Sequence, residues 1–449
     1  MAVVLLVSLY FALLIIQESL GLSLLAVYHY FRYCINSIFE RSVLFIFVLF
    51  APALLFDTSR YYITNLLVFL VFLFKPAKPE ESEVENSYPL VSVILPVYNE
   101  GDHIQHTIES ILESDYPNYE VIIVDDGSSD NTKEVCRNYQ RAGSVIYIRR
   151  EERGGKPSAL NMGFQFAKGA YIIHFDGEVI IYRDTIRKSL QPFSDPDVGV
   201  VSGNLKVAND KESLATRLQA AEYAMGITIQ RQWLAWADML QIASGAFSVF
   251  RRELMERVMG TDPETGEDLD ITIKIKKLSY KAAFAANAHA RTNVPKTFYT
   301  LFRQRIRWDM CFIRINLRKH CNILNLIRFK FSDFIAVISD ITLNVIGLAA
   351  FPIYIAVVAI FWPQYLLFII TVTYLFYTVM SFVQLSIAVL MSNEPVHDIY
   401  FILLAPIYFF YTIFLKIDRT IAYVSEFLRI KPYNDKFLPK KVLDSQTRF

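Results

Sequence analysis

Long uncharged apolar runs lie only near the two ends of this 449-residue chain and divide it into membrane and soluble parts. Toward the C-terminus, 365–391 contains 27 residues without a charge and 399–415 contains 17, while 334–361 is interrupted only by Asp340. A helix of about 20 apolar residues crosses a bilayer. We therefore expect C-terminal transmembrane helices within 333–416.

The N-terminal apolar runs are shorter, at 2–16, 43–56 and 61–74. Runs of this length also suit a signal-peptide core or a buried soluble helix. However, no Lys or Arg occurs before residue 32, so the charged start of a signal peptide is missing. We interpret 2–28 and 43–74 as two transmembrane helices that make up an N-terminal membrane region ending at residue 75.

Charge and cysteine content narrow the protein's class. The formal net charge is only +1, and we expect no nucleic acid among the partners. The four cysteines share no metal-ligand spacing and are too sparse for a disulfide framework. A reduced, cytosol-facing soluble body fits this pattern best.

The soluble body begins after a linker at 76–90, which is rich in proline and glutamate. From Val91, short β-rich runs such as "VSVILPV", "YEVIIVDD" and "AYIIHFD" alternate with helical segments at 103–114 and 158–167. This alternation predicts an α/β domain over 91–300, in which a mostly parallel sheet is flanked by helices. Ligands bind at the carboxyl ends of the strands in such sheets.

Two acidic motifs follow predicted strands. Asp125 and Asp126 stand where a strand gives way to a Gly/Ser turn, although such residues often only form turns or cap helices. Asp176 and Glu178, separated by one glycine, end an apolar run that reads as a buried strand. Unpaired charges there are costly, so we expect a positive partner such as a divalent cation; the alternative is a solvated turn.

Two further motifs are weaker on their own. Glu267 and Asp268 begin a helical segment, where acidic residues are favoured by the helix dipole in any case. Lys156 follows two glycines at a predicted helix start, a place where a lysine can meet a diphosphate or a base. The sequence lacks the full spacing of a phosphate-binding P-loop.

The segment "TLFRQRIRWDMCF" carries the most information. On a helix, Gln304, Arg307 and Trp308 share one face, where an amide and a guanidinium can hold phosphate oxygens while the indole stacks on a sugar. The other interpretation is a basic amphipathic helix on the membrane surface, because 301–332 contains eight Lys or Arg and one acidic residue. Both interpretations can hold together, and we assign 301–332 to amphipathic interfacial helices.

Taken in order, these motifs resemble those of the processive inverting membrane glycosyltransferases. This family includes the hyaluronan, cellulose, chitin and poly-N-acetylglucosamine synthases. The resemblance covers about 90–310 by motif and the whole chain by layout. It rests on Asp125-Asp126-Gly127, Gly155-Lys156, Asp176-Gly177-Glu178, "SGAFSVFRRE" at 244–253, Glu267-Asp268 and the pattern Q-x-x-R-W at 304–308.

The resemblance implies a GT-A-like nucleotide-sugar-binding domain inserted between N- and C-terminal transmembrane helices. It implies that Asp176 and Glu178 bind Mg²⁺ or Mn²⁺ on the diphosphate, with glutamate standing where the family usually has a second aspartate. Asp125 or Asp126 would contact the nucleotide, and Lys156 would contact its base or diphosphate.

The resemblance also implies the residues of the reaction. Asp268 would be the general base, with Glu267 orienting it. Arg307 would stabilise the leaving diphosphate together with Gln304, and Trp308 would form the floor for the terminal sugar of the acceptor. Ser244 and Gly245 would line the acceptor path. The expected partners are a nucleotide sugar, of which a UDP-sugar fits best, a glycan acceptor, the lipid bilayer and accessory subunits or further copies.

Orientation and activity leave alternatives open. The basic 301–332 segment places the body in the cytosol, beneath a plasma or inner membrane. Residues 416–449 carry eight basic and four acidic side chains, and we assign 417–449 as a basic tail. This charge predicts that the tail is also cytosolic, which three C-terminal spans would not allow.

For function, we expect a polysaccharide synthase that passes its product through the membrane; the alternatives are transfer of a single sugar to a lipid and a catalytically silent scaffold subunit.

Overall fold

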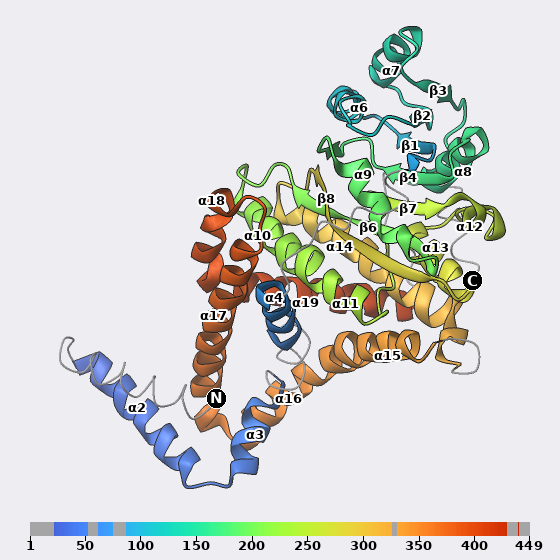
Figure 1. The fold of residues 1–449 in the computed structure, drawn as a ribbon. Coiled ribbons are helices and arrows are strands. Elements are labelled where there is room, and N and C mark those ends of the chain that lie inside the picture. Colours follow the sequence, from blue (N-terminus) through green and yellow to red (C-terminus); the bar gives the residue numbers. More distant parts are fainter. Residues whose placement is uncertain (1–21, 53–61, 75–86, 326–329, 429–438, 440–449) are drawn as a thin grey trace. The chain divides into compact units, whose positions relative to one another are not determined.

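The computed structural model describes residues 22–52, 62–74, 87–325, 330–428 and 439 (Figure 1). It divides into two compact units, one of residues 1–67 and 341–413 and the other of residues 68–340 and 414–449. Parts of five sequence predictions lie outside the described residues. These parts are 2–21 of the first predicted helix, 53–61 of the second, 76–86 of the linker, 326–329 of the interfacial segment, and the tail after residue 428 apart from residue 439.

An eight-stranded sheet forms the centre of the second unit, in the order β3-β2-β1-β4-β7-β6-β8-β5. The strands are β1 (Val91–Val97), β2 (Tyr119–Asp125), β3 (Ile146–Arg149), β4 (Tyr171–Phe175), β5 (Ile180–Ile181), β6 (Val198–Val207), β7 (Phe247–Arg251) and β8 (Lys281–Thr292).

The sheet is mixed, and the prediction of a mostly parallel sheet is confirmed, because among the described strands only β7 and β5 run against the others. The first four strands in the order pair in parallel, as β6 and β8 do, whereas β7 is antiparallel to both of its neighbours and β5 is antiparallel to β8. The predicted strands at 91–97, around 119–126 and around 170–176 are confirmed as β1, β2 and β4. Their Val- and Ile-rich runs are buried, as central strands require.

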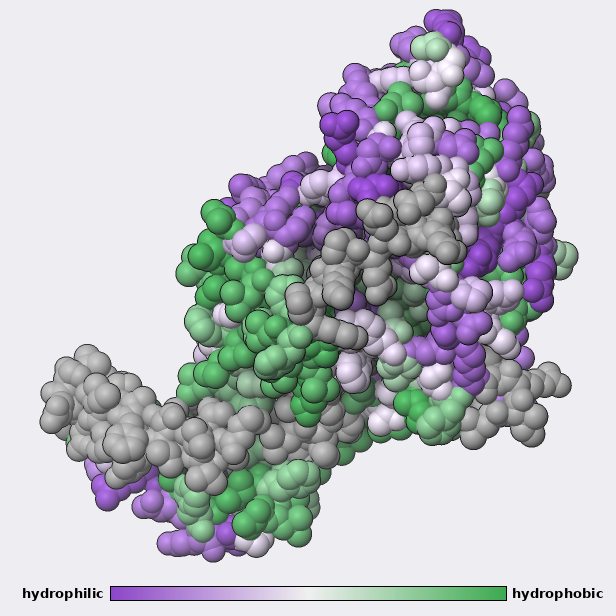
Figure 2. Space-filling model, viewed as in Figure 1, coloured by the Kyte–Doolittle hydropathy of each residue, from purple (hydrophilic) through white to green (hydrophobic). Residues whose placement is uncertain are grey.

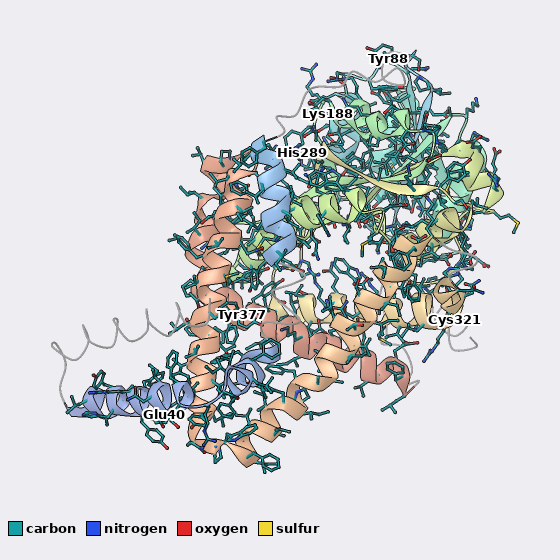
Figure 3. All side chains as sticks on the ribbon, turned by 60° about the horizontal axis from the view of Figure 1, so that its bottom comes forward. Glu40, Tyr88, Lys188, His289, Cys321 and Tyr377 are labelled. Atoms are coloured by element: carbon teal, nitrogen blue, oxygen red, sulfur yellow. The ribbon has the colours of Figure 1, made fainter. Side chains whose placement is uncertain are left out.

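Helices flank the sheet. They are α6 (Ile104–Leu112), α7 (Thr132–Arg141), α8 (Lys156–Phe166), α9 (Thr185–Leu190), α10 (Leu214–Tyr223), α11 (Arg231–Trp236), α12 (Arg252–Arg257) and α13 (Glu267–Lys277). Ala159 and Leu160 of α8 pack on Ile94 of β1 and Val124 of β2. Thr185 Oγ1, at the start of α9, donates to the carbonyl of His289 on β8 at 2.6 Å, and Figure 3 labels His289 near Lys188 of α9.

The end of α13 is fixed by a buried ion pair. Lys276 Nζ lies 2.6 Å from Asp333 Oδ1, and both side chains are 1% exposed. Asp333 belongs to α15 (Phe331–Asp340), the helix in which the C-terminal apolar region begins. Lys276 also donates to the carbonyls of Asp238 and Leu240 at 3.1 Å, so the buried ammonium is fully engaged.

Helix α14 (Phe298–Phe312) carries the Q-x-x-R-W pattern and continues into a π-helical segment, Ile313–Lys319. A capping box between Thr297 and Thr300 starts it. The second half of α19 (Ala405–Phe427) packs on this helix through charged pairs. Arg419 Nε donates to Asp309 Oδ1 at 3.0 Å, and Arg314 Nη2 lies 2.8 Å from Glu426 Oε2.

The first unit is built from apolar helices, with α2 (Leu22–Phe39), α3 (Val43–Pro52), α16 (Gly347–Phe361) and α17 (Leu366–Leu390) around one buried cluster. Residues such as Leu367, Phe382 and Leu390 of α17 are more than half exposed, and Figure 2 shows hydrophobic residues over this helix. The short helices α4 (Thr64–Phe74) and α18 (Pro395–Asp398) complete the described elements. Such exposed apolar surface suits contact with lipid.

Three helices are long and apolar enough to cross a membrane: Phe331–Phe361, Pro363–Leu390 and Pro395–Phe427. They confirm the predicted C-terminal membrane region. At the N-terminus the predicted boundaries do not hold, because α2 continues to Phe39 rather than ending at residue 28. The predicted helix over 43–74 contains α3 and the shorter apolar helix α4, with 53–61 outside the described residues.

Candidate active site

The acidic motifs lie at the carboxyl ends of neighbouring parallel strands. β1 lies between β2 and β4, and Val97 at the end of β1 pairs in register with Asp125 at the end of β2. Asp176 and Glu178 follow β4 directly. Since ligands bind outside this edge in open α/β sheets, the sequence-predicted carboxylates stand on the ligand side of the sheet.

Asp125 is buried, and both of its oxygens are engaged within the protein. Oδ1 accepts a hydrogen bond from the Ser128 amide at 2.7 Å, while Oδ2 accepts one from the Tyr147 hydroxyl at 2.7 Å. The guanidinium of Arg149 lies 3.3 Å from Oδ2. Asp125 therefore fixes the turn after β2, and its contact with a nucleotide stays a prediction.

Asp126 connects the turn after β2 to the glycine-rich loop. Its carboxylate accepts hydrogen bonds from the amides of Gly154 and Gly155 at 2.9 and 2.7 Å, and Arg150 Nη1 lies 3.2 Å away. Gly155 has φ +86°, a conformation that favours glycine. This loop places Lys156 at the first position of α8, directed into the site.

Lys156 is the centre of the site. Its Nζ lies 2.6 Å from Asp176 Oδ1 and 3.3 Å from Glu267 Oε1, and it donates to the carbonyl of Gly245 at 3.1 Å. Burial opposes its charge, but the carboxylates of Asp176 and Glu267 raise the pKa of Lys156 above its usual value. Lys156, which was a weak candidate from sequence alone, thus contacts residues of three predicted motifs.

Asp268 lies at the start of α13 and contacts the same glycine, Gly245, as Lys156 does. Its Oδ2 accepts from the Gly245 amide at 3.0 Å, and its Oδ1 accepts from the Leu269 amide at 2.8 Å. Burial, followed by the charge of Glu267, raises the pKa of Asp268 to about 6, while Lys156 and the two backbone hydrogen bonds oppose the rise. The carboxylate is therefore ionised at neutral pH and remains basic enough to accept a proton.

Position 245 requires glycine because Asp268 and Lys156 both approach its backbone closely. A Cβ at this position would lie 3.1 Å from Asp268 Oδ2 and 3.3 Å from Lys156 Nζ. Ser244, its neighbour, is 8% exposed. A small pocket opens here, lined by Leu160, His174, Gly245, Ser248, Phe250, Thr261, Glu267, Asp268 and Ile271.

The predicted metal ligands form a crowded carboxylate group that suits a cation. A Cβ on Gly177 would lie 3.0 Å from Glu100 Cγ, so Glu100 stands against the Asp176-Gly177-Glu178 turn. Burial and the charge of Asp176 raise the pKa of Glu178 to about 7, against a hydrogen bond from Thr292. Burial and the charges of Glu178 and Asp176 raise the pKa of Glu100 to about 8. Since hard divalent cations prefer such oxygen ligands, the residues present fit Mg²⁺ or Mn²⁺.

A second carboxylate group belongs to the scaffold. Among the described residues, oxygens of Asp262, Glu264 and Asp270 lie within 4.8 Å of one another. Lys319 pairs with all three, and His320 Nε2 lies 2.8 Å from Asp270 Oδ1. Because this charge is already neutralised, the group reads as an ion-pair network that anchors α13.

The Q-x-x-R-W residues share a face of α14, as predicted. Trp308 is 42% exposed, and Arg305 lies over its ring with the guanidinium carbon 4.6 Å from the ring centroid. Arg305 is itself held by Glu222 at 3.0 Å. Gln304 Oε1 is buried with no hydrogen-bond partner among the described residues, so a ligand with a donor group would satisfy it.

α14 also packs directly on the start of α13. A Cβ on Gly266, the residue before Glu267, would lie 2.9 Å from Cys311 Cβ, and Gly266 has φ +84°. Cys311 follows Arg307 by one turn of α14. The two predicted motifs therefore share one packing contact, which ties the position of Asp268 to that of the Q-x-x-R-W helix.

Comparison with known sequences finds a match in the sheet domain. Residues 92–259, less than half of the chain, match the model of the family described as "Glycosyl transferase family 2". The matched segment covers β1 to β7 and thus holds Lys156, Asp176 and Gly245, while Asp268 and α14 lie beyond it.

Relatives of the chain bear out the resemblance inferred from its motifs. It is 31% identical over 273 residues to poly-beta-1,6-N-acetyl-D-glucosamine synthase of Staphylococcus epidermidis, which covers 59% of this chain and 64% of that protein. It is 32% identical over 221 residues to the synthase of the same name from Staphylococcus aureus, which covers 49% of this chain and 53% of that protein. The chain thus spans less than two thirds of the length of the curated relatives it matches.

A solved structure supports the GT-A-like fold. A mannosyltransferase from Pyrobaculum calidifontis, in complex with GDP-Man and Mn²⁺, aligns with a TM-score of 0.58 and 21% identity, covering 85% of this chain and 99% of that chain. The predicted fold class is therefore confirmed.

Proposed function

We propose that the protein is a membrane glycosyltransferase that transfers N-acetylglucosamine from a UDP-sugar to a growing polysaccharide. The observation that carries the proposal is the contact of Gly245 with both Lys156 and Asp268: its carbonyl accepts from the cation, and its amide donates to the basic carboxylate. Transfer with inversion needs these two functions on opposite faces of the sugar. The N-acetylglucosamine donor is inferred from the relatives' name.

The donor side of the site is positively charged where the diphosphate leaves. Lys156 pairs with Asp176 and Glu267 in the free protein, and on donor binding it would exchange these partners for phosphate oxygens. Arg307 of α14 would add a guanidinium, and Asp125 and Asp126 hold the loops against which the nucleotide would lie. A divalent cation held by Asp176 and Glu178 would neutralise the negative charge that develops on the leaving group.

The acceptor side is organised around Asp268. Its carboxylate would take the proton of the acceptor hydroxyl as that oxygen bonds to the anomeric carbon. Ser244 and Gly245 lie beside this carboxylate. Glu267 contributes to the electrostatic environment of Asp268 through its ion pair with Lys156. Trp308 would stack on the terminal sugar, with its other face covered by Arg305.

The membrane helices would guide the product. We propose that the catalytic unit faces the cytosol at a plasma or inner membrane and that the polymer passes through the apolar helical region, with accessory subunits or further copies as partners. The basic α14 region and the paired charges of α19 support placement at the cytosolic surface.

Nucleotide release by the purified full-length protein in detergent tests this function. The donors to compare are UDP-GlcNAc, UDP-glucose, UDP-GlcA, UDP-galactose and GDP-mannose, each with Mg²⁺ or Mn²⁺. We expect release to be fastest with UDP-GlcNAc and to require Asp268. Absence of release with every donor and either metal would contradict the proposal and favour a scaffold subunit.

A further inference from the structure

Arg231 is a partly buried cation beside the site that none of the sequence motifs includes. It begins α11, directly after the π-helical segment Ala224–Gln230. Its Nη1 donates to Ser202 Oγ on β6 at 2.9 Å, and within the described residues this is its one hydrogen bond. A guanidinium carries five donors and stays charged in proteins, so this side chain brings a fixed positive charge into the interior.

Ser202 connects Arg231 to the loop of residues 243–245, which contacts Asp268. The same Ser202 Oγ accepts from the Ser244 amide at 3.2 Å, which uses both acceptor positions of the hydroxyl. The loop is held at three consecutive amides: Ala243 donates to Thr272 Oγ1 at 3.0 Å, Ser244 to Ser202, and Gly245 to Asp268 Oδ2 at 3.0 Å. Arg231 therefore orients the acceptor of the middle hydrogen bond.

The charge of Arg231 also acts on the base. Burial lowers the pKa of Arg231, and the Asp268 carboxylate opposes that shift, so the two groups attract. The other titratable groups that face Asp268 are Lys156 of α8, Glu267 of its own helix, Cys311 of α14 and His174 of β4. Burial lowers the pKa of His174 to about 3, and burial raises the pKa of Cys311 to about 12, so both are neutral at physiological pH.

We propose that Arg231 is a positioning residue for transfer: through Ser202 it holds the Ser244–Gly245 loop in place, so that the Gly245 amide keeps its hydrogen bond to Asp268. The inference rests on the proposed function, in which Asp268 is the general base. It adds a cation on the acceptor side of the site, whereas Lys156 reaches the donor side through Asp176.

The test is the pH profile of nucleotide release by the full-length protein and four variants. Arg231→Gln shortens and neutralises the donor to Ser202, and its acid limb should move upward by about one pH unit, because a carboxylate that loses the Gly245 hydrogen bond is easier to protonate. Ser202→Ala removes the acceptor that Arg231 and the Ser244 amide share, so its limb should move in the same direction. Arg231→Lys keeps a charged donor but not the planar fork, so its limb should stay in place while kcat falls several-fold. Arg217→Gln, on the exposed face of α10, is the matched control and should match the wild type.

A purely structural role would lower kcat by the same factor at every pH. An acid limb of Arg231→Gln that coincides with that of the wild type would overturn the inference. If Arg231→Gln does not fold, an acid limb of Ser202→Ala that coincides with that of the wild type would overturn the inference instead, and a displaced limb would support it. Failure of the proposed function is distinct, because the wild type would then release no nucleotide or Asp268→Asn would keep both turnover and the acid limb.

Discussion

Replacing Asp268 by asparagine isolates the proton-accepting role from the shape of the site. The amide has nearly the same volume, but it has one carbonyl oxygen, so it keeps only one of the two hydrogen bonds from Gly245 and Leu269. That loss should cost about 1 kcal/mol of stability. Loss of the general base should lower kcat by about 10²–10⁴-fold, which corresponds to about 3–5 kcal/mol in the activation free energy.

The pH profile gives this prediction its second readout. With the pKa of Asp268 at about 6, the wild-type carboxylate is only about 10% ionised at pH 5 and about 90% ionised at pH 7, so turnover should rise about ninefold between them. The variant should lose this dependence and still bind UDP, because the contact between Lys156 and Asp176 does not involve Asp268. Nucleotide release and calorimetric UDP titration measure the two effects. Turnover within about threefold of the wild type would refute the assignment of the base.

Three further predictions concern the metal site, the scaffold and the acceptor platform. Affinity for Mn²⁺ should rise about tenfold between pH 6 and pH 8, because Glu178, with its pKa at about 7, must lose its proton to bind a cation; calorimetry showing a constant affinity would contradict this. Lys276→Met should destabilise the catalytic unit by about 3–5 kcal/mol, since it leaves Asp333 buried and unpaired, and a double variant that also replaces Asp333 by leucine should recover much of the lost thermal stability. Trp308→Ala should raise the acceptor KM by about tenfold while Trp308→Phe stays near the wild type; equal effects of the two variants would argue against stacking.

The first half of the catalytic fold was readable because each strand is a continuous β-branched run. β1 and β4 are buried along almost their whole length, and they are rich in Val, Ile and Tyr, which are residue types enriched in strands. In the second half, β6 was readable from its run "VGVVSG", but β8 was not. β8 has the sequence "KAAFAANAHART", whose alanines favour helix, and it is a strand only because it pairs with β6 and β5.

The site was predictable in its members but not in its connections. Each motif could be located from charge at a strand end or a helix start, yet nothing in the spacing around Lys156 marked this lysine as central. Its central place follows from the Asp126 contacts that set the preceding loop and from the approach of Gly245, which are contacts between segments far apart in the chain. Glu100 was missed for the same reason, although an acidic residue shortly after β1 is the same kind of signal as Asp176 after β4.

Membrane placement shows the limit of reading hydropathy alone. The apolar run 399–415 ends at Leu415, but the helix continues to Phe427. The added turns carry Arg419 and Glu426, whose partners Asp309 and Arg314 come from α14 and the segment after it. A charged helix end that packs on the catalytic unit cannot be distinguished from a soluble tail by composition.

The length of the product made from UDP-GlcNAc by the purified full-length protein tests the central claim most directly. Radiolabelled donor with Mn²⁺ or Mg²⁺, followed by sizing of the product on a gel and digestion with a hexosaminidase specific for β-1,6 linkages, gives both chain length and linkage. We predict a long polymer that the hexosaminidase degrades and that is absent with Asp268→Asn. A product of single-sugar length attached to lipid would contradict the account.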